Sequence, residues 1–142
     1  MLKKTIKYTD YNDIERTEDF YFNLTEAELM EMEMGTVGGI TEMIQKIVAA
    51  KDTPQIIRVF KEIILKAYGE KSDDGKQFMK VDENGRPLSI AFSQKEAYSK
   101  LFMELATDDK AGADFINGIM PKKIRDQIDP KQLEEKMREL GN

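Results

Sequence analysis

The strongest constraint on the fold is an apolar helical segment between residues 53 and 68. Its apolar side chains make one wide surface: Ile56, Ile57, Val59, Phe60, Ile63, Ile64, Ala67 and Tyr68. Thr53 can act as an N-cap, and Pro54 suits the first helical position, where a missing N–H costs nothing. Because so apolar a helix must be covered, we expect it at the centre of the one core that 142 residues can close.

The N-terminal segment predicts a β-hairpin. Residues 2–9 and 16–24 are rich in β-branched and aromatic side chains, and the turn-forming residues 10–13 lie between them. In the second arm Phe20 and Phe22 share one face, while Tyr21 points to the other. Since a lone hairpin is marginally stable in water, we expect helices behind it.

A capping box predicts that a helix begins after the hairpin. Thr25 and Glu28 have the required spacing, and the alternating Met and Glu residues of segment 29–34 are good helix formers. The glycine-rich residues 35–39 are expected to end this helix. Regular apolar spacing then predicts another helix over residues 40–51.

Two more helices are expected in the second half of the chain. Ser93 and Glu96 repeat the capping-box spacing and predict a helix through about Ala106. Asp108 can cap the next helix, which should end before Pro121. Between these helices and the central one, residues 69–76 are expected to form a polar loop, and residues 82–85 carry the Asn-Gly signal of a tight turn.

These elements together predict a mainly helical α+β fold, with an N-terminal β-hairpin packed on a bundle of about five or six helices. We expect residues 1–121 to form a single globular domain. Residues 122–142 are expected to form a charged C-terminal helix or tail, which has apolar residues at helical spacing at Leu133, Met137 and Leu140.

Composition excludes several classes of chemistry. The chain has neither Cys nor His, so disulfides, thiolate nucleophiles, imidazole metal ligands and the Ser-His-Asp triad cannot occur. The acidic loops lack EF-hand spacing, and the glycine-rich loop lacks the Gly-Lys-Ser/Thr ending of a P-loop. We therefore expect no enzyme activity, no cofactor and no metal.

Charge and hydropathy limit the partners. The formal net charge is −5, which argues against sequence-independent binding to nucleic acid because such binding depends on an excess of Lys and Arg. No segment approaches the apolar run of about 20 residues that spans a bilayer. We therefore expect a cytosolic protein that binds neither nucleic acid nor membrane.

Two surface features suggest a protein-binding role. Methionine accounts for nine residues, three of them in segment 30–34, and flexible Met side chains are common where a surface accepts varied hydrophobic helices. The segment from Glu15 to Glu33 is strongly acidic, which would keep a docking surface soluble or attract a basic partner. Two clusters hold more apolar side chains than one buried face can take, and they predict six contact residues: Met30, Met32, Met34, Phe115, Ile116 and Met120.

Several segments resemble a known family. Residues 18–29 (EDFYFNLTEAEL), 60–72 (FKEIILKAYGEKS), 96–111 (EAYSKLFMELATDDKA) and 114–119 (DFINGI), with Pro121, are similar to small tail assembly chaperones encoded by tailed phages and prophages of Gram-positive bacteria. The resemblance covers about residues 5–121.

The resemblance implies a non-virion protein of the host bacterial cytoplasm. It would bind the long helical tape-measure protein and keep it soluble until tail-tube subunits polymerise around it. In such families a second, longer product is often made by ribosomal frameshifting, and its extra domain recruits tail-tube subunits. No catalytic residues come with the resemblance.

Two other functions are left open by the sequence. The runner-up is an acidic phage-encoded inhibitor of a host DNA-binding or defence protein, in which carboxylates imitate DNA phosphates. Binding of that kind should weaken steeply with salt, whereas helix binding in an apolar groove should change little. A structural virion component is the third alternative.

Overall fold

A β-hairpin forms the N-terminal part of the fold. The computed structural model describes residues 1–32, 53–126, 131, 134, 135 and 138. Strands β1 (Leu2–Thr9) and β2 (Glu15–Phe22) pair antiparallel along their whole length. In the turn, the Asp10 carboxylate accepts hydrogen bonds from the backbone N–H groups of Asn12 and Ile14 and pairs with Arg16 at 2.6 Å. The predicted hairpin is therefore confirmed.

The sheet continues beyond the hairpin. Strands β3 (Tyr68–Lys71) and β4 (Phe78–Met79) extend it to the antiparallel order β1-β2-β3-β4. The prediction of a loop over residues 69–76 is therefore wrong for its first three residues. Gly69 pairs with Tyr21 of β2, a contact distant in sequence that the local composition of Gly-Glu-Lys does not reveal.

The helices follow the predicted caps in part. Helix α1 (Glu26–Glu31) has the complete capping box of Thr25 and Glu28, and helix α6 (Asp109–Ile119) is capped by Asp108, so both caps are confirmed. The cap at Ser93 is wrong. Ser93 ends the unpredicted helix α4 (Leu88–Ser93), and its hydroxyl donates to the Ile90 carbonyl instead. The described part of the chain also contains helices α3 (Thr53–Ala67), α5 (Glu96–Thr107) and α7 (Lys122–Arg125).

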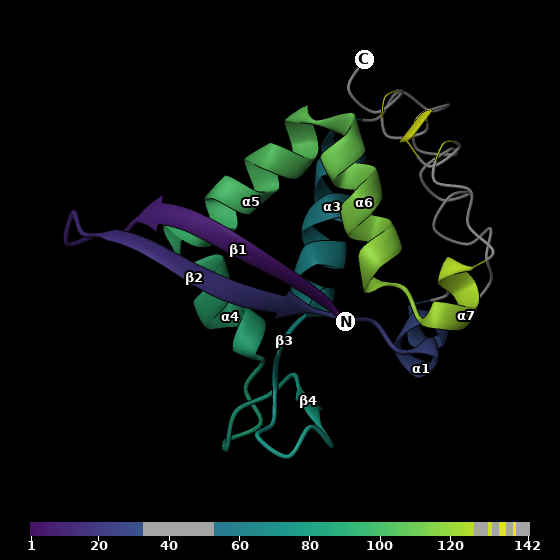
Figure 1. Ribbon diagram of the computed structural model, residues 1–142, viewed down its shortest axis with the longest axis horizontal. Coiled ribbons are helices and arrows are strands. Elements are labelled where there is room, and N and C mark those ends of the chain that lie inside the picture. Colours follow the sequence, from purple (N-terminus) through teal and green to yellow (C-terminus); the bar gives the residue numbers. More distant parts are fainter. Residues whose placement is uncertain (33–52, 127–130, 132–133, 136–137, 139–142) are drawn as a thin grey trace.

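Helices lie against one face of the hairpin and enclose the core between the two layers (Figure 1). Phe20 and Phe22 both point into this core, as predicted, with Tyr21 only partly buried on the other face. The Phe22 ring centroid lies 5.2 Å from that of Phe115 and 5.7 Å from that of Phe92, both from helices. The α+β class is confirmed, whereas a bundle of helices is not.

Some predictions lie outside the described residues. These are the helix over 40–51, the glycine-rich loop and the apolar residues of the C-terminal tail. The boundary at residue 121 stays a prediction. Arg138 lies 3.7 Å from the Asp109 carboxylate, which connects the tail to the start of α6. Over the described parts of the chain, every helix is too short or too polar to span a bilayer.

Candidate functional site

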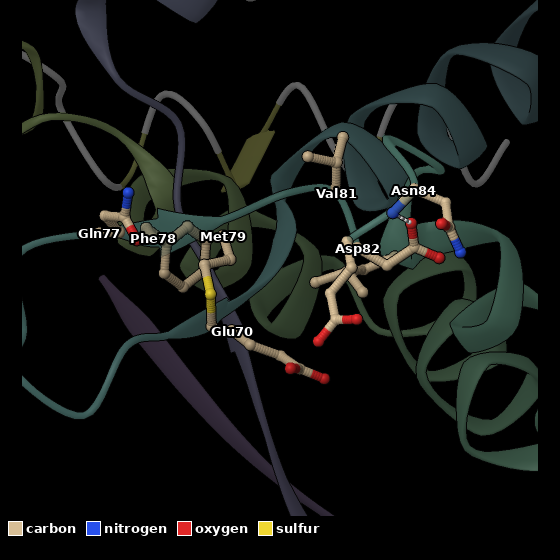
Figure 2. A pocket seen from close by; sticks show the side chains of 9 residues that line it. Glu70, Gln77, Phe78, Met79, Val81, Asp82 and Asn84 are labelled. Carbon is tan, nitrogen blue, oxygen red and sulfur yellow. Dashed lines mark hydrogen bonds between the residues drawn. The ribbon is translucent and has the colours of Figure 1, made fainter.

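An open groove lies beside β4, at the lower end of the molecule in Figure 1. It has a volume of about 860 Å³, and Figure 2 shows the side chains that line it. Its walls come from β3, β4 and the chain that follows as far as the start of α4. The lining residues are Glu70, Gln77, Phe78, Met79, Val81, Asp82, Glu83, Asn84 and Leu88.

A glycine allows the groove to form where β3 meets β4. A Cβ atom on Gly69 would lie 2.6 Å from Cε2 of Phe78 and 2.7 Å from the carbonyl oxygen of Met79. Without a side chain at this position, the Phe78 ring can lie directly against the backbone of β3. The neighbouring Glu70 pairs with Met79 in the β3–β4 ladder.

A tight turn forms the opposite end of the groove. The Asp82 carboxylate accepts hydrogen bonds from the backbone N–H groups of Asn84 at 2.8 Å and Arg86 at 2.9 Å, and Figure 2 shows the first of these. Gly85 adopts a φ of 77°, which the predicted Asn-Gly turn requires. The chain then returns, and the N–H of Leu88 donates to the Lys80 carbonyl at 2.9 Å.

The groove combines an apolar floor with an acidic rim. Phe78, Met79 and Leu88 are partly buried, and Val81 is 51% exposed. Glu70, Asp82 and Glu83 supply three carboxylates, all on exposed residues. Neither Lys nor Arg is among the described residues that line the groove. Its surface is therefore apolar at the base and negative at the edge.

Lys80 lies between two lining residues in the sequence, but its ammonium group bonds to residues outside the groove. Its Nζ atom donates to the Asn23 carbonyl at 2.8 Å and to the Lys66 carbonyl, and it lies 3.1 Å from Oε2 of Glu28. Burial lowers the pKa of Lys80, and the Glu28 carboxylate opposes that shift. Lys80 thus connects β4 to the ends of β2 and α3, and its Nζ atom also lies 5.3 Å from the centroid of the Phe78 ring.

The structure separates the six predicted contact residues into four groups. Met30 is 73% exposed on α1, Met32 is partly buried against the core, and Met34 lies outside the described residues. Phe115, Ile116 and Met120 are at most 2% exposed. The reason for choosing these last three was wrong, because α6 contacts both β1 and α5 and buries more than one of its faces.

The groove itself was missed at the sequence level. The Asn-Gly signal located the turn, and the apolar residues at 78, 79, 81 and 88 were visible, but nothing local showed that they lie together. Within the described residues, no three acidic side chains gather closely enough to hold a metal ion. The groove offers a surface for binding by contact.

Fold and groove define a small acidic α+β protein with an open apolar groove on its surface. The chain belongs to the phage tail assembly chaperone family, because a family model described as "Phage tail assembly chaperone" matches residues 1–141. The resemblance seen in the sequence is thereby confirmed at the level of the family. No curated protein and no solved structure gives a significant match.

Proposed function

We propose that this chain binds the helical tape-measure protein of its phage and keeps it soluble in the host bacterial cytoplasm during tail assembly. The binding is reversible and involves neither a cofactor nor a chemical step. The observation that carries the proposal is the family match over nearly the whole chain. The groove beside β4 supports it with a surface suited to a hydrophobic segment.

Physical chemistry connects the groove to this task. Before the tail tube forms around it, a long amphipathic helix exposes an apolar stripe. Such helices would associate with one another through these stripes. A partner that covers the stripe removes this tendency if it stays soluble itself. The net charge of −5 and the acidic rim of the groove supply that solubility.

Met30 is proposed as a second contact, with its neighbours Met32 and Met34. Met30 is among the most exposed large apolar side chains described, although Leu29 beside it is fully buried. Unbranched, polarizable Met side chains adapt to partners of varied shape. A Met30→Ser variant should weaken binding and leave the fold intact, because the side chain makes little contribution to the core.

Co-expression with the tape-measure protein of the same genome tests the proposal. We expect a soluble complex in size-exclusion chromatography with light scattering, with several copies of this chain per tape-measure chain. The complex should persist at about 1 M salt, where charges are screened beyond about 3 Å, because apolar contact supplies most of its stability. A tape-measure protein that stays insoluble and forms no complex would refute the proposal.

In this proposal, a longer frameshifted product recruits the tail-tube protein. We therefore expect the present chain alone to bind the tape-measure protein without binding tube subunits. Mixing the purified chain with monomeric tube protein, and measuring the mass of the product by light scattering, checks this division of roles. A complex between tube protein and the 142-residue chain would contradict it.

A further inference from the structure

The charged residues that line the groove beside β4 are all acidic, whereas the nearby Lys80 ammonium pairs with Glu28. Glu70 lies on β3, and Asp82 and Glu83 lie in the turn after β4, so the lining carboxylates come from two segments of the chain. The Asp82 carboxylate is fixed by two backbone N–H donors. No cation among the described lining residues neutralises the three acids.

We propose that this groove binds a protein segment in which Lys or Arg residues flank apolar side chains. The assignment of that segment to the tape-measure protein rests on the proposed function. The chemistry of the segment rests on the groove alone. Its apolar side chains cover the floor at Val81 and Leu88, and its cations reach the carboxylates of Glu70 and Glu83.

Charge complementarity selects this occupant. Nucleic acid does not fit the groove, because its phosphates would meet three carboxylates and none of the described lining residues is a cation. An acidic amphipathic segment could contact the floor, but its charges would be repelled by the rim. A basic segment can contact the apolar floor and pair with the acidic rim at the same time. Repulsion between like charges makes the groove bind a basic segment more tightly than an acidic one.

The position of the exposed apolar residue agrees with this assignment. Val81 is 51% exposed, and Glu83 follows it two residues later. A partner side chain that packs on Val81 therefore has an acidic residue of this chain, Glu83, two positions from its contact. Apolar burial supplies affinity at this point, and the neighbouring charges fix which segment is accepted.

Two labelled peptides of equal length test the proposal with the full-length chain. Both carry leucine at the same amphipathic helical positions, and the flanking positions hold lysine in one and glutamate in the other. Fluorescence anisotropy should show binding of the lysine peptide and much weaker binding of the glutamate peptide. Amide shifts in two-dimensional NMR should change at residues 70, 77–84 and 88.

Matched variants locate the effect. Glu70→Lys and Glu83→Lys should each raise the dissociation constant of the lysine peptide about five-fold, since each removes an exposed attractive pair. Asp73→Lys makes the same change of charge at an exposed position outside the groove and should have less than half that effect. Val81→Ser should also weaken binding about five-fold. The similarly exposed Ile90, changed to Ser, should leave binding unaltered.

Equal binding of the two peptides would overturn the proposal. So would an effect of Asp73→Lys as large as that of Glu83→Lys, or amide shifts that lie away from the groove.

The variants in the co-expression experiment separate this proposal from the proposed function. If the wild-type chain solubilises the tape-measure protein and Val81→Ser and Glu83→Lys do so equally well, the groove assignment fails and the chaperone function stands. If the lysine peptide binds in the groove but no tape-measure complex forms, the groove assignment stands and the proposed chaperone function fails.

Discussion

Tyr68 and Phe92 stack face to face, with ring centroids 4.2 Å apart and an angle of 5° between the rings. Tyr68 is the first residue of β3, directly after α3, and Phe92 lies in α4. Phe92 also contacts the rings of Phe20 and Phe22 from β2, at 5.3 and 5.7 Å. One aromatic cluster therefore joins the sheet to the chain segments on both sides of the groove.

Phe92→Ala should be among the most destabilising single substitutions. The side chain is fully buried, and its removal leaves a cavity among aromatic rings, which we expect to cost about 3–5 kcal/mol in the free energy of unfolding. Urea unfolding followed by circular dichroism measures the loss. Met103→Ala, at a side chain 55% exposed, is the control and should change stability by less than about 0.5 kcal/mol. Similar losses in both variants would contradict the assignment of Phe92 to the core.

Local patterns were sufficient to predict the hairpin and several helix ends. The alternation at Phe20 and Phe22 and the caps at Thr25 and Asp108 depend on residues within a few positions of one another. In each case a side chain satisfies a neighbouring backbone group or faces a side determined by strand geometry. Such features can be read from sequence because the stabilising contacts are themselves local.

Features that depend on distant contacts were not predicted. Strand β3 exists because Tyr68 and Gly69 pair with β2, which lies more than forty residues earlier in the chain. The groove depends in addition on the β3–β4 pairing, which places Glu70 beside Met79. Phe115 and Ile116 were assigned to a binding surface because the sequence does not show how many sides of α6 are covered.

Replacing Lys80 should loosen the connection between β4 and the rest of the sheet. In Lys80→Met, the carbonyls of Asn23 and Lys66 lose a donor and the Glu28 carboxylate loses its cation. We expect a loss of about 1–3 kcal/mol, because partly buried acceptors are left unsatisfied. Thermal unfolding measures it. Lys76→Met, at an exposed lysine of the same loop region, is the matched control, and an equal loss there would contradict the role assigned to Lys80.

The Tyr8 hydroxyl should lose its proton at a higher pH than an ordinary tyrosine, so the free energy of unfolding should depend on pH in the alkaline range. Its hydroxyl donates to Glu18, and this bond, with burial and repulsion by the carboxylate, raises the pKa of Tyr8 from 10.0 to about 12. The unfolded chain therefore loses its proton first as the pH rises. The stability that Tyr8 contributes is complete below pH 10 and is lost between pH 10 and about 12.

Two measurements check this titration. The ultraviolet difference between the wild type and Tyr8→Phe isolates one tyrosinate, which should form near pH 12, and Glu18→Gln should move it to lower pH. The free energy of unfolding should fall more steeply above pH 10 in the wild type than in Tyr8→Phe. Identical slopes, or an ordinary pKa for Tyr8, would show that the hydrogen bond to Glu18 does not exist in solution.

Gly69→Ala should damage the groove more than the fold. The new Cβ would meet the Phe78 ring at 2.6 Å and the Met79 carbonyl at 2.7 Å, so β4 must move away from β3. Overpacking of this kind costs about 1–3 kcal/mol, and the displaced Phe78 and Met79 no longer form the apolar floor. We expect a chain that remains folded by circular dichroism but forms less tape-measure complex than the wild type. Gly118→Ala is the control, because the three atoms nearest to its Cβ all belong to the flexible side chain of Leu2, at 3.0 Å or more, and the complex should form as in the wild type. Full complex formation by Gly69→Ala, with the amide shifts of Phe78 and Met79 unchanged, would show that the close approach of β4 to Gly69 is unnecessary for the groove.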